Sequence, residues 1–169
     1  MKKRPDLVMV RDRIIVPALV AIDSYSKAAE RLVLATGLAE SGYLHVRQVA
    51  RYKPGGGVAA YGPARGYFQM EPATHDDLWA NYLGATRRAN LLEGLRKITD
   101  HPGDPEEMVR NPQYAAAMCR IFYLRIRAPL PAENDLRGMA EYWKRYYNTR
   151  LGKGTVEGFM EKAAEAMSL

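Results

Sequence analysis

Glu40 is the first candidate for chemistry in this sequence, because its carboxyl group is expected at the end of a helix. The helix-like stretch before it begins at Ser26, a good N-cap residue, and Gly42 is a typical helix terminator. The partial negative charge of a helix end disfavours a carboxylate, and Leu38 and Tyr43 are expected to add desolvation. Both effects raise the pKa of the carboxyl group, as a general acid working near neutral pH requires. The alternative is a solvated glutamate that merely closes the helix.

Two short strings resemble motifs of one enzyme family. Residues 39–43 read Ala-Glu-Ser-Gly-Tyr and resemble the Glu-Ser motif of lytic transglycosylases and related lysozyme-like enzymes. Residues 66–74 read Gly-Tyr-Phe-Gln-Met-Glu-Pro-Ala-Thr and resemble the Gly-x-x-Gln-x-x-Pro-Ala-Thr segment of the same family. The resemblance extends over residues 7–148. It implies cleavage of the β-1,4 bond between N-acetylmuramic acid and N-acetylglucosamine in peptidoglycan.

The resemblance also implies roles for individual residues. Glu40 is expected to be the catalytic acid and base, and Ser41 and Gln69 are expected to bind the sugar close to it. Tyr67 and Phe68 are expected to line the cleft wall or to pack beneath it.

Two later segments resemble the family in part. Residues 111–124 resemble Asn-x-x-x-Asn-Ile-x-x-Gly-x-x-Tyr-Leu, with the central asparagine and glycine replaced and Tyr-Leu one position late. They imply a helix and a substrate contact at Tyr123. Residues 146–150 resemble the closing Ala-Tyr-Asn-x-Gly segment without its glycine, which implies a substrate contact at Tyr147.

Glu71 departs from the family pattern, which usually carries an apolar residue there, and adds a second carboxylate to the segment. If Glu71 faces the cleft, it is a candidate to position water in a lysozyme-type hydrolysis. If it faces solvent or pairs with Arg65, Glu40 acts alone and the product is an anhydro sugar. In a strand, Gln69 and Glu71 would share one face, which favours the cleft position.

The histidines are weaker candidates. His45 and Gln48 follow Glu40 in an extended segment and are candidates to bind sugar or to order the acid, with a surface or packed histidine as the alternative. His75 lies in the first turn of a predicted helix and is expected to be solvated. Together with His101 they show neither HExxH nor paired-cysteine spacing, so no metal site is expected. No cofactor is expected either.

The composition predicts one ordinary globular domain over residues 1–169. Hydrophobic residues make up 47% and charged residues 26%, which excludes a disordered chain, and no long linker divides it. The formal net charge of +6 favours polyanions, which include nucleic acid, anionic lipid and acidic wall polymers. The basic residues are scattered rather than gathered in a stripe, so no specific nucleic-acid partner is expected.

Three further features concern membrane insertion, export and the redox state of the chain. The longest wholly apolar run, residues 14–22, is far shorter than the roughly 20 residues of a membrane-spanning helix, so no span is expected. No cleavage site follows the basic N-terminus, so the chain is expected to lack a signal peptide. Cys119 is the single cysteine and is expected to be a buried structural thiol.

Local signals predict a mainly α fold. Helices are expected at residues 6–22, 26–41, from Thr74 to near 84, 91–98, from Asp104, 112–128, from Asn134 or Asp135, and about 155–167. The apolar residues around the circumference of 112–128 indicate a central buried helix, and Trp143 belongs to the apolar side of the helix after Asp135. Residues 43–70 predict irregular loops and a short hairpin around Gly55-Gly56-Gly57, which form one cleft wall. This layout is similar to the α+β lysozyme-like fold, with a small β-poor lobe beside the helical part.

The sequence therefore predicts a muramidase-type enzyme, either a lysozyme-like hydrolase or a lytic transglycosylase. The resemblance implies a phage lysin or a virion-associated enzyme, made in the host cytoplasm and acting on the wall after release or carried in the virion. Its partners would be bacterial peptidoglycan and phage particle proteins. The alternatives are a non-catalytic wall-binding or virion structural domain and a basic helical nucleic-acid binder.

Overall fold

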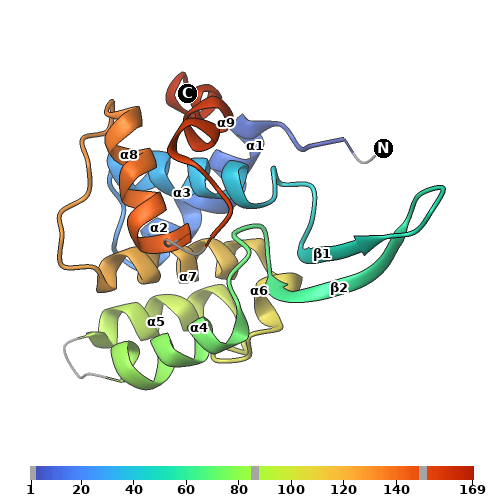
Figure 1. Cartoon of the computed structure of the whole chain (residues 1–169). Helices are drawn as coiled ribbons and strands as arrows, with labels where there is room; N and C mark the ends of the chain where they lie inside the picture. Colours follow the sequence, from blue (N-terminus) through green and yellow to red (C-terminus); the bar gives the residue numbers. More distant parts are fainter. Residues whose placement is uncertain (1–2, 85–87, 149–151) are drawn as a thin grey trace.

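The computed structural model describes residues 3–84, 88–148 and 152–169 and shows a body of helices from which one β-hairpin projects (Figure 1). The helices are α1 (Leu7–Val10), α2 (Val16–Ala21), α3 (Lys27–Glu40), α4 (Pro72–Leu78), α5 (Ala89–Ile98), α6 (Glu107–Arg110), α7 (Pro112–Arg125), α8 (Leu136–Trp143) and α9 (Val156–Met167), with π-helical turns η1 (Arg11–Ile15), η2 (Trp79–Leu83) and η4 (Lys144–Asn148). The predicted mainly α class is confirmed. None of the helices in these ranges is long and apolar enough to cross a bilayer.

Helix α7 is the centre of the core, as the sequence predicts. Asn111 caps it, because its side-chain oxygen accepts hydrogen bonds from the backbone N–H groups of Gln113 at 3.0 Å and Tyr114 at 3.2 Å. Every residue from Tyr114 to Tyr123 is buried, so neighbouring elements cover the whole circumference of the helix. In Figure 1, α7 runs between α2, α3 and α8 on one side and α4 and α5 on the other. Cys119 lies within this stretch and is fully buried, as predicted.

Helix α3 carries Glu40 as its last residue and is fixed at both ends by local contacts. The hydroxyl of Ser26 accepts a hydrogen bond from the backbone N–H of Ala29 at 3.1 Å, which confirms the predicted N-cap. Gly42 has φ +58°, which confirms the left-handed terminator. The chain then turns back, and the Tyr43 hydroxyl donates to the carbonyl of Leu34 at 2.9 Å. The end of α3 is therefore held by its own following segment.

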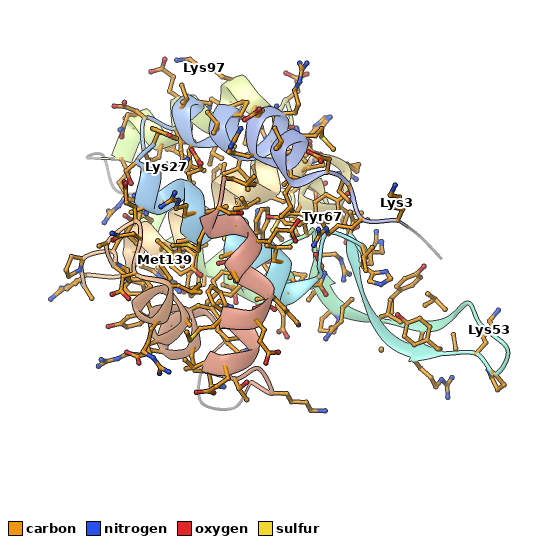
Figure 2. The ribbon with its side chains drawn as sticks, turned by 90° about the horizontal axis from the view of Figure 1, so that it is seen from above. Lys3, Lys27, Lys53, Tyr67, Lys97 and Met139 are labelled. Atoms are coloured by element: carbon orange, nitrogen blue, oxygen red, sulfur yellow. The ribbon has the colours of Figure 1, made fainter. Side chains whose placement is uncertain are left out.

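The hairpin consists of strands β1 (Arg47–Tyr52) and β2 (Val58–Arg65), which pair in an antiparallel sheet. The three glycines between them all have positive φ, which confirms the predicted turn, although the strands extend well beyond it. Lys53 lies near the far end of the hairpin, whereas Tyr67 lies against the helical body (Figure 2). Glu106 anchors the base, because its carboxylate accepts hydrogen bonds from Arg47 at 2.5 Å and Arg65 at 2.6 Å.

The start of α4 differs from the sequence prediction. The helix begins at Pro72, with Glu71 in the N-cap position, so Thr74 lies in the first turn instead of capping it. His75, predicted to be solvated, is completely buried. The reason is tertiary: His75 and Leu78 are the buried residues of α4, which packs against α7, and the His75 ring is hydrogen-bonded to Tyr114 of α7.

The hydrogen bonds around His75 determine which ring nitrogen carries the proton. The Tyr114 hydroxyl accepts from the backbone N–H of Gly103 at 3.1 Å and from the indole of Trp79 at 3.2 Å. A hydroxyl has one proton and two acceptor lone pairs, so Tyr114 donates that proton to Nε2 of His75 at 2.8 Å. The ring proton therefore sits on Nδ1, which donates to Asp76 at 2.9 Å. Burial lowers the pKa of His75, despite the opposite effect of Asp76.

We predict that His75 makes folding sensitive to mild acid. Because its folded pKa lies below its unfolded value of about 6.5, the unfolded chain gains the proton first, and the free energy of unfolding falls as pH drops below about 6.5. His75→Gln keeps an acceptor for Tyr114 and removes this titration. Urea unfolding between pH 8 and 5 should give the variant a shallower pH dependence than the wild type. His101→Gln, at an exposed histidine, is the control and should keep the wild-type slope. Equal slopes for all three proteins would contradict the prediction.

Candidate active site

Glu40 is partly buried at the end of α3, where Trp143 of α8 and Lys162 of α9 lie near it. The indole N–H of Trp143 donates to its Oε1 at 2.9 Å. Burial raises the pKa of Glu40, whereas this hydrogen bond and the charge of Lys162 lower it, and the net shift is upward. Lys162 donates to the carbonyl of Ala39 at 3.1 Å and so offsets the negative end of the helix. The raised pKa predicted from the sequence is therefore present, and desolvation is its main cause.

The turn that carries Gln69 is attached directly to the end of α3. The Ser41 hydroxyl donates to the carbonyl of Tyr67 at 2.6 Å and accepts from the backbone N–H of Tyr43 at 3.1 Å. The Tyr147 hydroxyl donates to the carbonyl of Phe68 at 2.7 Å. These two hydroxyl contacts fix consecutive carbonyl groups of the turn relative to Glu40.

The conformation of this turn depends on its own sequence. Gly66 has φ +70°, and a Cβ there would lie 2.7 Å from the carbonyl oxygen of Met108, so only glycine fits. Gln69 has φ +50°, and its side-chain Nε2 donates to the carbonyl of Gly66 at 2.8 Å. The turn is closed by backbone hydrogen bonds between Arg65 and Met70. Gln69 therefore lies in a turn at which the chain reverses, and not in a strand that would place Gln69 and Glu71 on one face.

A cleft of about 480 Å³ opens beside Glu40. Its lining residues are Glu40, Ser41, His45, Gln48, Val49, Tyr52, Ala64, Gln69, Glu71, Tyr147, Asn148 and Gly152. The structure thus brings together seven candidate site residues from separate parts of the chain, which are Glu40, Ser41, His45, Gln48, Gln69, Glu71 and Tyr147. None of these lining residues is a lysine or an arginine, although the chain as a whole is basic.

Three predicted site residues do not line this cleft. Phe68 is 1% exposed and packs edge-on against Tyr43, with ring centroids 6.2 Å apart. Tyr123 is also 1% exposed, and its hydroxyl is hydrogen-bonded to Thr36 at 2.8 Å, so the predicted substrate contact is wrong in this structure. The ring of Tyr67 packs edge-on against Tyr43, with ring centroids 5.3 Å apart, and its backbone carbonyl accepts the hydrogen bond from Ser41. All three support the site from beneath.

Glu71 lines the cleft and is exposed. The alternative in which it pairs with Arg65 is wrong, because Arg65 binds Glu106 at the base of the hairpin. Gln69 and Glu71 both reach the cleft, but they do so from a turn and a helix N-terminus rather than from one strand.

Sequence reasoning missed Trp143, Lys162 and Asn148 as site residues. Trp143 follows the apolar pattern of α8, which predicts a core position, yet a buried indole N–H needs an acceptor, and Glu40 is that acceptor. Asn148 lines the cleft, and its side-chain oxygen accepts from Lys144 at 2.8 Å. The last two positions of the segment at 146–150 lie outside the described residues.

The structure and the comparisons add two further findings. Within residues 3–84, 88–148 and 152–169, no group of three or more histidine, cysteine, aspartate or glutamate side chains is placed to hold a metal ion. Searches against protein-family models, curated proteins and solved structures find no match to this chain.

We predict that Trp143 restrains the pKa of Glu40. Trp143→Phe keeps an aromatic ring against Phe159 but removes the hydrogen bond that favours the carboxylate, so the pKa of Glu40 should rise further. An NMR titration of the Glu40 side-chain carboxyl carbon measures this directly. The control is Trp79→Phe, which removes the other indole and should leave the midpoint unchanged. A midpoint that stays constant or falls in Trp143→Phe would remove the indole from the electrostatics of the site.

Proposed function

We propose that this chain is a peptidoglycan-cleaving glycosidase in which Glu40 is the general acid. The observation that carries the proposal is a carboxyl group with a raised pKa on the wall of a polar cleft that also contains Gln69. The resemblance of the strings around these two residues to lytic transglycosylase motifs supports the choice of substrate. The proposed bond is the β-1,4 link between N-acetylmuramic acid and N-acetylglucosamine, and the proposed setting is a phage lysin or a virion-associated enzyme.

The environment of Glu40 suits proton donation to a glycosidic oxygen. Its Oε1 accepts the indole hydrogen bond of Trp143, which leaves Oε2 as the oxygen that carries the proton. A raised pKa keeps this proton in place at higher pH than for an ordinary glutamate and allows its transfer as the glycosidic bond breaks. Transfer of the proton leaves Glu40 as a carboxylate, which regains a proton from solvent before the next turnover.

The amide groups of the cleft suit a sugar that carries hydroxyl and acetamido groups. Gln69 uses its Nε2 to bind Gly66, so its side-chain oxygen remains as an acceptor for a substrate N–H or O–H. Asn148 uses its side-chain oxygen to bind Lys144, so its amide N–H groups remain as donors. One acceptor and one donor of fixed orientation therefore belong to the same cleft as the acid.

We propose that Glu71 positions the water that attacks the anomeric carbon. It lines the same cleft as Glu40, and its carboxylate has no ion-pair partner among the described residues. A second carboxylate of this kind is characteristic of hydrolysis, whereas cleavage by a lone acid leaves an anhydro sugar.

We predict that Glu40→Gln abolishes cleavage of purified peptidoglycan while leaving the fold intact. The amide keeps the volume and the acceptor for Trp143 but has no transferable proton, so the rate should fall by at least about 10²-fold. Release of soluble fragments measures the rate, and circular dichroism checks the fold. Glu93→Gln, on α5, is the control and should cleave like the wild type. Fragment release by Glu40→Gln at close to the wild-type rate would exclude Glu40 as the acid.

We predict that Glu71→Gln lowers kcat by at least about tenfold and changes KM little, because the water is activated only in the reaction step. Steady-state rates on soluble glycan strands separate the two constants. A silent substitution would show that Glu40 acts without a second carboxylate.

A further inference from the structure

A second hollow, of about 410 Å³, shares Glu40 with the cleft but is not lined by the turn that carries Gln69. Lys153 and Lys162 line it, together with Trp143, Asn148 and the first turn of α9. We call it the basic hollow. Lys153 is exposed and precedes α9, whereas Lys162 lies on that helix.

The basic hollow and the cleft share part of their walls. Glu40 and Asn148 line both. A ligand whose sugar occupies the cleft therefore has a short path for a substituent into the basic hollow. The bond to be broken would lie next to this shared wall, because Glu40 is part of it.

The charge that the described residues give to the two spaces differs. The described lining of the cleft includes Glu40 and Glu71 and no lysine or arginine, whereas the basic hollow contains two lysines and only Glu40 as an acid. Glu40 does not cancel their charge when it carries its proton. The N-terminus of the twelve-residue helix α9 adds partial positive charge, and Thr155 caps it by accepting from the backbone N–H of Gly158 at 3.0 Å. The basic hollow therefore favours an anionic group.

We propose that the basic hollow binds a carboxylate of the peptide that peptidoglycan carries on N-acetylmuramic acid. This inference rests on the proposed function, since it assumes that the sugar bearing the peptide occupies the cleft. It makes the substrate a peptide-substituted glycan rather than a bare chitin-like chain. The lysines hold the carboxylate by charge, and the sugar is thereby aligned with Glu40.

Lys153 is the better residue for a test. Lys162 binds the Ala39 carbonyl and lowers the pKa of Glu40, so replacing it would alter the acid as well as the basic hollow. Lys153 also lines the basic hollow, but the pKa of Glu40 depends on burial, Trp143 and Lys162 and not on Lys153. Lys97→Gln removes the same charge from α5, which lies at the opposite end of the molecule from α9 (Figure 1), and is the matched control.

The first experiment measures binding without cleavage, in a Glu40→Gln background. Calorimetric titrations compare a soluble disaccharide-peptide with the same disaccharide after removal of the peptide. We expect the peptide form to bind about three- to tenfold tighter, as one or two exposed ion pairs allow. Adding Lys153→Gln should bring this ratio close to one, and adding Lys97→Gln should leave it unchanged. Equal affinities for the two ligands before any lysine is replaced would overturn the proposal.

The second experiment measures cleavage of glycan strands with and without their peptides by protein that retains Glu40. The kcat/KM ratio between the two substrates should exceed one and should fall in Lys153→Gln but not in Lys97→Gln. Cleavage of both strands at equal rates would overturn the role of the basic hollow and leave the proposed function standing. If neither strand is cleaved, the proposed function fails, and the titrations still decide whether the basic hollow recognises the peptide. A glycerol-phosphate oligomer that binds through Lys153 while the disaccharide-peptide does not would assign the basic hollow to wall phosphate and overturn the peptide assignment.

Discussion

The hydrogen bonds from Ser41 and Tyr147 to the carbonyls of Tyr67 and Phe68 are the contacts on which the rest of the site depends. They connect the end of α3 and the π-helical turn η4 to the turn that carries Gln69. The left-handed backbone of Gln69 costs about 1 to 2 kcal/mol, and two hydrogen bonds of about 1 kcal/mol each offset this. Without them, Glu40 and Gln69 would still lie on well-formed local elements but would have no fixed separation. Ser41 thus acts by positioning, and its hydroxyl is already occupied by the protein.

The burial of Glu40 disfavours its ionised form and so makes the stability of the fold depend on pH. Because burial raises its folded pKa above the unfolded value, the favourable contribution of the protonated form is full at low pH and is lost as pH rises through the folded value. Trp143 and Lys162 limit that loss by favouring the carboxylate. A general acid needs this balance, since a carboxyl group with an ordinary pKa would already have lost its proton at neutral pH.

The sequence predicts best those features that neighbouring residues determine. Ser26, Asn111 and Asp135 each accept the backbone hydrogen bond of an N-cap, the last helix begins next to Thr155 as expected, and the three glycines form the hairpin turn. Apart from the starts of α4 and α6, which begin at Pro72 and Glu107 rather than at Thr74 and Asp104, the failures concern contacts between distant segments. His75 is buried because α4 packs on α7.

The same limit applies to the site. Trp143 meets Glu40 across more than a hundred residues, and local periodicity alone predicts only a core position for it. The strings around Glu40 and Gln69 identify which residues meet, but not that Phe68 and Tyr123 lie beneath the cleft rather than in it. Those positions depend on how the aromatic side chains pack around Tyr43 and Thr36, which no short pattern records.

The central claim, that the cleft breaks a glycosidic bond with Glu40 as the acid, is tested most directly by mass spectrometry of peptidoglycan digested with this protein. The account predicts disaccharide-peptide fragments with N-acetylmuramic acid at the newly formed end. A reducing end gained from water would indicate that Glu71 takes part, and an anhydro end would indicate that Glu40 acts alone. Peptidoglycan that yields no new muramyl ends after prolonged incubation with folded protein would contradict the account.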